Sequence, residues 1–143
     1  MCIRDRKILH QDSRITVKAL SEKVHLSQPS CAERLRRLIE QEIIEKCSIQ
    51  VSPKALGFPI AAIAGPSAAL ELARVEKLIT EIDEIVQCDK VTGDDAFVCR
   101  MHLRGIEELD HCLRKIASFA TTSTSIVKST LVSNRLLPLD GAD

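Results

Sequence analysis

Two helical patterns that meet at a short turn constrain this chain more than any other feature. Residues 16–24, TVKALSEKV, place apolar side chains at the spacing of one helix face, and Thr16 can cap the first turn. Ser27 is a strong candidate to cap the next helix, because Pro29 is tolerated in a first turn where its missing N–H has no partner. Two helices joined in this way predict a helix-turn-helix.

The second of these helices combines an apolar face with an arginine-bearing face. We expect the inward face to contain Cys31, Leu35, Leu38 and Ile39. The outer face contains Gln28, Ser30, Glu33, Arg34 and Arg37. A capped helix N-terminus and arginine side chains both suit nucleic-acid phosphate, and arginine also reads guanine edges in the major groove. The alternative is a solvated face whose arginines pair with Glu33 and Glu40.

Charge divides the chain in a way that supports two modules. Residues 1–50 contain ten Lys and Arg against seven Asp and Glu, whereas residues 51–143 contain ten against thirteen. The net charges of +3 and −3 cancel to the overall zero. This asymmetry favours a first module that faces a polyanion.

The second half of the chain alternates strand and helix patterns. A linker is expected at residues 45–57, and its first part, 45–51, alternates like a strand. The predicted order that follows is strand 58–65, helix 68–82, strand 85–91, strand 97–103, helix 105–117 and strand 124–133. This is the ferredoxin-like βαββαβ order, so the fold class is α+β. Helices cover one face of such a sheet, and a second copy of the chain is the simplest partner for the other face.

Composition limits the core and the compartment. The chain has no Trp or Tyr and three Phe, so its core must be aliphatic. No apolar run is long enough to span a bilayer and no signal peptide is visible, so we expect a cytoplasmic protein without a membrane partner. The six cysteines, at positions 2, 31, 47, 88, 99 and 112, show no metal-ligand spacing. We therefore expect them to act as small buried apolar residues, with no metal site, disulfide or cofactor.

An ordered series of motifs resembles the Lrp/AsnC family of transcription regulators over roughly residues 7–139. The motifs are DSRIT at 12–16, LSEKVHLSQPSCAERLRRLIEQEII at 20–44, KALG at 54–57, VTGDDAFV at 91–98 and TSTSIVKS at 122–129. The resemblance implies an N-terminal winged helix-turn-helix, a hinge strand, and a C-terminal ferredoxin-like (RAM-type) domain. It also implies binding to double-stranded DNA, homodimers that assemble further, up to octamers, and an amino-acid effector.

The resemblance assigns two sets of residues by position. The expected DNA-binding residues are Ser27, Gln28, Ser30, Arg34, Arg36 and Arg37. Gln28, Ser30 and Arg34 would contact bases, and the other two arginines would contact phosphate. The expected effector-binding residues are Gly93, Asp94, Asp95, Thr122 and Thr124. Without the resemblance, the Gly-Asp-Asp segment is an ordinary turn and the threonines fit any exposed strand.

Three positions depart from the family pattern. Residues 1–6, MCIRDR, match nothing in it, so we expect a truncated or non-native start. Ala96 stands where many members have an acidic residue, and Asp95 could replace that residue by a shift of one position. Glu42 stands where a helix-ending glycine is common, so the end of this helix should cost more here.

The predicted domain bounds are 1–44 for the helix-turn-helix domain, 45–57 for the hinge strand or linker, and 58–143 for the ferredoxin-like domain. Three functions remain open for this architecture. The first is a DNA-binding regulator that responds to an amino acid. The second is an enzyme similar to the sirohaem decarboxylases, which resemble the same two-part architecture. Such an enzyme needs histidines and arginines around a tetrapyrrole, and the residues available here are His102, His111, Arg100 and Arg104. The third is an architectural DNA binder without an effector.

Overall fold

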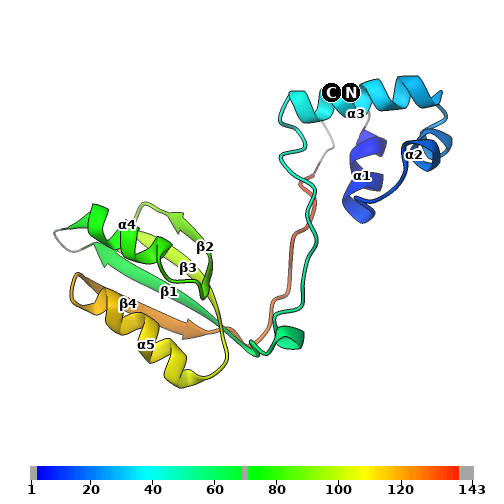
Figure 1. Cartoon of the computed structure of the whole chain (residues 1–143). Helices are drawn as coiled ribbons and strands as arrows, with labels where there is room; N and C mark the ends of the chain where they lie inside the picture. Colours follow the sequence, from blue (N-terminus) through cyan, green and yellow to red (C-terminus); the bar gives the residue numbers. More distant parts are fainter. Residues whose placement is uncertain (1–2, 69–70, 139–143) are drawn as a thin grey trace. The chain divides into compact units, whose positions relative to one another are not determined.

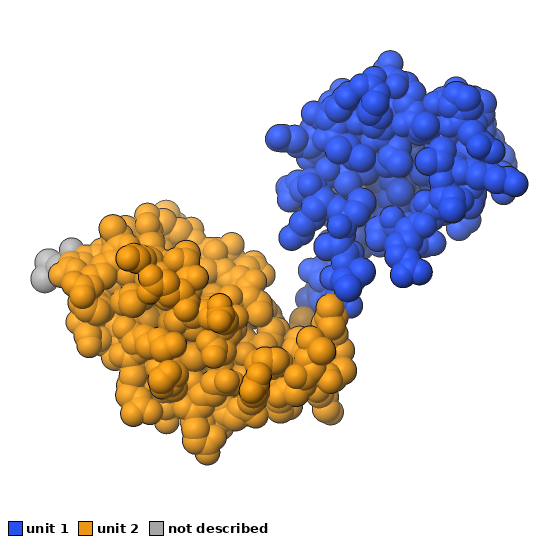
Figure 2. Space-filling model, viewed as in Figure 1, with its two compact units in different colours: residues 1–50, 132–143 blue, residues 51–131 orange. Residues whose placement is uncertain are grey.

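The computed structural model describes residues 3–68 and 71–138. They group into two compact units, which Figure 2 colours separately. Unit 1 contains the described residues up to Gln50 and from Val132 onward, and unit 2 spans Val51–Leu131. The predicted bounds put residues 132–143 with the second domain, whereas the described part of this segment groups with unit 1. The domain bounds stay a prediction.

Unit 1 contains three helices (Figure 1): α1 (Ile3–Gln11), α2 (Val17–Val24) and α3 (Gln28–Glu40). Both predicted N-caps are confirmed. The Thr16 side chain accepts a hydrogen bond from the Ala19 N–H at 3.2 Å, and the Ser27 side chain accepts one from the Ser30 N–H at 3.3 Å. These caps satisfy N–H groups that a helix cannot pair internally. The predicted helix-turn-helix is therefore present.

The end of α3 adopts the left-handed conformation that the sequence predicts at Glu42. Its φ is +55°, its N–H donates to the Ile39 carbonyl at 3.0 Å, and the Ile43 N–H donates to the Leu38 carbonyl at 3.0 Å. This pair of bonds is a Schellman motif, in which glycine is the preferred residue at the left-handed position. The left-handed geometry that makes a residue with a Cβ costly is thus present at Glu42, and the size of the cost stays a prediction.

Two predictions about unit 1 are wrong. Ile39 is 51% exposed instead of inward-facing, because it lies near the end of α3 and faces an open groove with Leu35 and Ile43. Residues 45–51 form no strand. Their alternating pattern supplies two faces, but a strand also needs a neighbour for its backbone N–H and C=O groups, and no described segment pairs with them.

Unit 2 is an antiparallel sheet with two helices on one face (Figure 1). Its elements are a short 3₁₀ helix (Lys54–Leu56), β1 (Ile60–Ala68), α4 (Leu72–Thr80), β2 (Ile85–Lys90), β3 (Phe97–Leu103), α5 (Ile106–Ala117) and β4 (Ala120–Ile126). The strand order is β2-β3-β1-β4. The predicted ferredoxin-like order is confirmed.

The core of unit 2 lies between this sheet and the two helices. Every second residue of β3 is buried, as the period of a half-covered strand requires. The helices contribute Val75 and Ile79 from α4, and Leu109, Cys112 and Ile116 from α5. Val75, Ile79, Leu109 and Ile116 lie at the helical spacing of an inward face, as predicted. The same spacing predicted that Ile106 faces inward, which is wrong because Ile106 is 50% exposed at the first position of α5, and it did not indicate Cys112. Apart from Phe97 and the sulfur-containing Cys99, Met101 and Cys112, the buried core residues are aliphatic.

The last strand lies earlier in the chain than the predicted range 124–133. β4 starts almost directly after α5 and pairs with β1 from Ala68↔Ala120 to Ala62↔Ile126, so its place in the chain is set by the register with β1. The first strand extends beyond the predicted range 58–65 and includes Pro66. No helix within residues 3–68 and 71–138 has the length and apolar character needed to cross a membrane.

Candidate nucleic-acid interface

The start of α3 is presented by a tight turn after α2. His25 has a φ of +57°, and the Leu26 N–H donates to the Ser21 carbonyl at 3.0 Å, which ends α2 within one residue. Ser27 then caps α3, and its hydroxyl also donates to the Ser30 hydroxyl at 2.8 Å. Gln28 and Ser30 are exposed on the first turn of α3. The predicted base-contacting end of the helix is therefore open to solvent.

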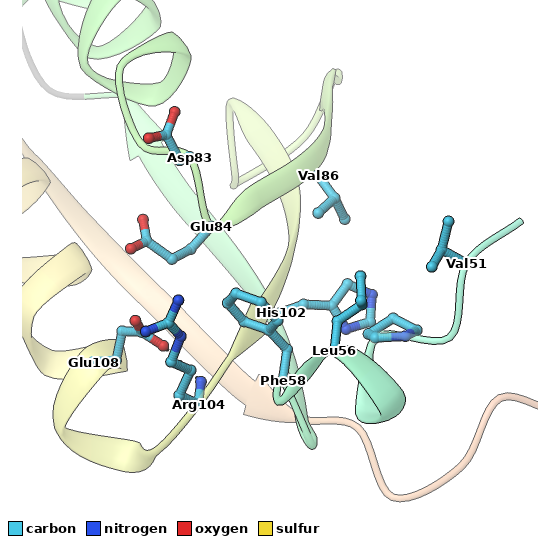
Figure 3. A pocket seen from close by; sticks show the side chains of 10 residues that line it. Val51, Leu56, Phe58, Asp83, Glu84, Val86, His102, Arg104 and Glu108 are labelled. Carbon is cyan, nitrogen blue, oxygen red and sulfur yellow. Dashed lines mark hydrogen bonds between the residues drawn. The ribbon is translucent and has the colours of Figure 1, made fainter.

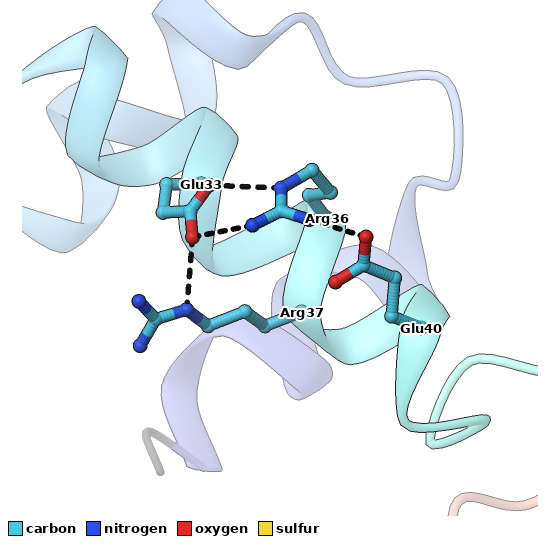
Figure 4. A network of polar contacts seen from close by, with 4 residues as sticks. All are labelled: Glu33, Arg36, Arg37 and Glu40. Carbon is cyan, nitrogen blue, oxygen red and sulfur yellow. Dashed lines mark hydrogen bonds and ion pairs between the residues drawn. The ribbon is translucent and has the colours of Figure 1, made fainter.

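Two turns further along α3, the arginines are paired with carboxylates on the same helix (Figure 4). The Arg36 guanidinium donates to both oxygens of Glu33, at 2.9 and 2.7 Å, and also to Glu40. Arg37 Nε donates to Glu33 Oε1 at 2.9 Å. Hydrogen bonds from Arg36 and Arg37 lower the pKa of Glu33 to about 2, so this carboxylate stays ionised at neutral pH.

This network matches the alternative interpretation of a solvated, self-paired helix face. All four side chains are more than 40% exposed, so each pair adds little to stability. Exposed arginines of this kind remain able to exchange a carboxylate partner for a phosphate. The geometry is thus compatible with both interpretations of the arginine face.

Arg34 faces a different neighbour from the other arginines. Its Nη1 atom donates to Asp5 Oδ2 of α1 at 3.1 Å, and the Asp5 side chain is only 4% exposed. Arg34 is itself 37% exposed. The pair ties α3 to α1 and compensates a buried carboxylate. Sequence reasoning missed Asp5, because it lies in the segment that matches nothing in the family pattern.

The predicted effector residues do not come together at one place in unit 2. Gly93 has a φ of +137°, in an open turn between β2 and β3, and Asp94 is exposed beside it. Thr122 and Thr124 lie opposite Pro66 and Ala64 of β1, and Ala64 is part of the core. Opposite residues of neighbouring strands share a face, so both threonines point to the helix-covered side.

Asp95 instead lies against the sheet face that the helices leave uncovered. Its Oδ2 accepts a hydrogen bond from the Ser123 hydroxyl at 3.4 Å. A Cβ added at Gly65 would lie 2.5 Å from the same oxygen, so only glycine leaves room for this carboxylate. Sequence reasoning missed Gly65 and Ser123. Strand alternation was the available signal, because Ser123 must point away from the side that Thr122 and Thr124 share.

A separate pocket of about 480 Å³ lies in unit 2 (Figure 3). Glu84, Glu108 and the guanidinium of Arg104 gather at one end, and Val51 and Val86 lie at the other. It contains none of the predicted site residues. Of the residues that the sirohaem hypothesis needs, only His102 and Arg104 line it. Burial and the charge of Arg100 lower the pKa of His102, so its imidazole is neutral near pH 7.

Comparisons with known proteins agree with this architecture. Residues 7–45 match the family described as winged helix-turn-helix DNA-binding, and residues 65–137 match the Lrp/AsnC ligand binding domain. The chain is 35% identical over 133 residues to the HTH-type transcriptional regulator LrpA of Bacillus subtilis, a match that covers 86% of this chain and 94% of LrpA.

Two solved structures extend the likeness to the whole fold. The structure of B. subtilis LrpC has a TM-score of 0.86 at 25% identity and covers 94% of this chain and 99% of that chain. A transcriptional regulator from Neisseria meningitidis, solved with L-Met, has a TM-score of 0.86 at 21% identity and covers 98% and 97%. At that identity the Neisseria structure supports the fold alone.

A capped, arginine-bearing second helix in a helix-turn-helix, together with a ferredoxin-like unit, defines a DNA-binding transcriptional regulator. More specifically, the chain belongs to the Lrp/AsnC family. The predicted family and fold class are confirmed. Both Bacillus relatives, LrpA and LrpC, are named as transcriptional regulators, which agrees with a role other than catalysis.

Proposed function

We propose that the first turn of α3 reads base edges in the major groove of double-stranded DNA. The observation that carries this proposal is the exposed, Ser27-capped start of α3 directly after the tight turn at His25. Gln28 is the residue best suited to base contact, because its exposed amide has no hydrogen-bond partner among the described residues. Ser27 and Ser30 bond to each other and would add contacts at the same end.

Arg36 and Arg37 would supply phosphate contacts that do not depend on sequence. Their exposed guanidinium groups lie on the same helix as Gln28, and phosphate can replace Glu33 and Glu40 as their partner. Arg34 remains part of the predicted set. Its bond to the buried Asp5 favours an anchoring role over a base contact, and both roles can be separated by measurement.

DNA fragments selected in vitro for binding provide the test. Gln28→Ala should lose roughly 1–3 kcal/mol on the selected sequence and keep its affinity for random DNA. Arg37→Ala should weaken binding to both the selected and the random DNA. It should also reduce the slope of log K against the logarithm of the salt concentration by about one. Lys77→Ala, an exposed cation on α4, is the control and should change neither. Equal binding of Gln28→Ala and parent to the selected sequence would contradict the major-groove assignment.

We infer that two copies of unit 2 associate through the uncovered face of the sheet. Ile63 and Val98 on that face are half-buried in the single chain, and neither described helix packs on them. Ile63→Asp should then reduce the sedimentation mass of the parent oligomer. Ile106→Asp, at an exposed position of α5, is the control. A dimer that survives Ile63→Asp would exclude this face.

We also infer that the region around Asp95 binds an amino-acid effector. The Asp95 carboxylate fits against Gly65 and is partly exposed, so a ligand's ammonium group could pair with it, and the open turn at Gly93 leaves space nearby. The fold-level likeness to a regulator solved with L-Met is in agreement. The predicted Thr122 and Thr124 would need a second surface, because they point to the other side of the sheet.

A thermal-shift screen with the common amino acids tests this inference. A ligand present at about 100 times its Kd stabilises the folded state by about 2.7 kcal/mol, so the melting temperature should rise. Asp95→Asn should remove the shift, whereas Asp110→Asn on α5 should keep it. If no amino acid shifts the parent, the architectural DNA binder is the better description. Titration with sirohaem, monitored for a Soret band, tests the enzyme alternative.

Regulation of a bacterial or archaeal chromosome would place the protein in the cytoplasm, where thiols are kept reduced.

A further inference from the structure

Two cysteines, for which the sequence predicted no disulfide, lie next to each other in unit 2. Cys88 of β2 is the direct cross-strand partner of Cys99 of β3. The Cys99 thiol donates to Cys88 Sγ, with the two sulfur atoms 3.2 Å apart. Directly opposite residues of antiparallel strands have Cα atoms about 4.5–5.5 Å apart, which lies within the range that a disulfide bridges. The strand register and the short distance between the sulfur atoms therefore favour a disulfide at this pair.

The two thiols differ in their access to solvent. Cys88 is exposed, whereas Cys99 is completely buried in the core. Cys88 lines a hollow of about 320 Å³ with residues at the end of α4, including Ile79 and Thr80. This is the helix-covered side, because Cys99 belongs to the core there. A second copy on the opposite sheet face would leave Cys88 open to small reagents.

Their reactivity is divided in the same way. Burial raises the pKa of Cys99 to about 12, so this group stays a thiol at neutral pH. A small oxidant therefore reaches Cys88 and reacts with it first, and Cys99 is positioned to react second. The expectation that the cysteines are small buried apolar residues is correct for Cys31, Cys99 and Cys112, and wrong for Cys47 and Cys88. Cys2 lies outside the described residues.

We propose that Cys88 and Cys99 are an oxidation site that forms an intrachain disulfide when the protein meets a hydroperoxide. The Cys88 sulfur attacks the peroxide, the O–O bond breaks, and the products are a sulfenic acid at Cys88 and an alcohol, or water from hydrogen peroxide. The Cys99 sulfur then attacks the sulfenic sulfur, the S–O bond breaks, and one water leaves as the S–S bond forms. Both thiols are oxidised and the peroxide is reduced.

The disulfide would fasten the edge strand β2 to β3 two residue pairs before the turn of their hairpin. It would close the loop formed by residues 89–98, which includes the turn at Gly93. The site itself depends only on β2 and β3. The proposal therefore stands or falls independently of DNA or effector binding.

The experiment uses the full-length chain, reduced, desalted and treated with limiting hydrogen peroxide. Remaining thiols are blocked with N-ethylmaleimide, and the protein is digested with trypsin without reductant. Cleavage after Lys77, Lys90 and Arg100 puts Cys88 and Cys99 on separate peptides, 78–90 and 91–100. We expect these two peptides to be recovered as one linked species that dithiothreitol separates. The exposed Cys47, on peptide 47–54, is the internal control and should not link to either.

Two variants assign the order of the steps. Cys99→Ala should stop the reaction at a sulfenic acid on Cys88, which dimedone traps. Cys88→Ser changes an exposed side chain. In this variant Cys99 should stay a free thiol that is neither oxidised by peroxide nor linked to another cysteine. Recovery of the parent peptides 78–90 and 91–100 unlinked would overturn the proposal, whether Cys88 is alkylated or over-oxidised. If Cys99→Ala does not fold, the parent and Cys88→Ser decide the question alone.

Discussion

The two units of this protein hold their helices by different means. Unit 2 has a contiguous core of thirteen buried residues between the sheet and its helices. In the described part of unit 1, the buried apolar residues are Leu20, Cys31 and Leu38, and Asp5 and Ser21 are buried beside them. Unit 1 therefore relies more on directed contacts: two N-caps, two Schellman ends and the ion pair between Asp5 and Arg34.

This difference teaches where each unit is sensitive. A packed core responds to lost volume, because its neighbours cannot relax fully into a cavity. A small helical unit responds to lost hydrogen bonds and caps, each of which is a larger share of its stability. The same contrast explains why the arginines of α3 need separate treatment, since one is bound into the unit and two lie on its surface.

The largest effect is expected from a cavity in unit 2. Ile116 is 2% exposed on α5, so Ile116→Ala should lower the free energy of unfolding of this unit by about 2–5 kcal/mol. Ile106, on the same helix, is 50% exposed, and Ile106→Ala should stay within about 0.5 kcal/mol of the parent. Urea unfolding, monitored by hydrogen exchange of the amides in each unit, measures the free energy of unfolding of both variants. A similar loss for the two variants would argue against the core described here.

The next effect should come from the anchor in unit 1. Arg34→Ala leaves the buried Asp5 carboxylate unpaired, and we expect a loss of roughly 1–3 kcal/mol, reduced from the fully buried case because Arg34 is partly exposed. Arg37→Ala, at a 66% exposed position of the same helix, should cost less than about 1 kcal/mol.

A double-mutant cycle with Asp5→Ala separates anchoring from DNA contact at Arg34. If Arg34 is an anchor, Arg34→Ala and Asp5→Ala should be non-additive in stability, and the folded fraction of each should bind DNA like the parent. Loss of specific DNA binding in folded Arg34→Ala, with Asp5→Ala unaffected, would restore the base-contacting role.

The sequence predicts the fold of unit 2 well because its signals are local and repeated. The spacing of Val75, Ile79 and Ile116 reports buried helix faces, and the alternation in β3 reports a half-covered strand. Errors occur where a partner decides the outcome. Residues 45–51 alternate without a neighbouring strand, and β4 shifts because its register is set by β1.

The candidate sites were predicted less completely, for the same physical reason. Ser27 and Thr16 act within one turn of helix, so a single segment reveals them. The contacts of Asp95 with Gly65 and Ser123, and of Arg34 with Asp5, join positions far apart in the chain. Residue type and spacing do not reveal such pairs until the strands and helices are placed.

A smaller effect is expected from the surface network on α3. The pKa of Glu33 is lowered from 4.5 to about 2, so its ionised form stabilises the folded state above pH 4.5. That contribution is lost as the pH falls from 4.5 through 2. Glu33→Gln removes it, so unfolding of unit 1 should depend less steeply on pH in this window than in the parent. Acid titrations followed by circular dichroism compare the two slopes, and parallel slopes would show that the network is not formed in solution.

The smallest effect should be a gain in stability at the end of α3. Glu42 has a φ of +55°, a conformation that disfavours every residue with a Cβ, so Glu42→Gly should stabilise unit 1 by about 0.5–1 kcal/mol. Ala32→Gly, at an exposed position inside the same helix, should instead cost about 1 kcal/mol. If the two substitutions by glycine change the free energy of unfolding in opposite directions, the backbone conformation at each position is the cause. If Glu42→Gly destabilises as much as Ala32→Gly, the left-handed end of α3 is absent in solution, and unit 1 loses one of the directed contacts that distinguish it from unit 2.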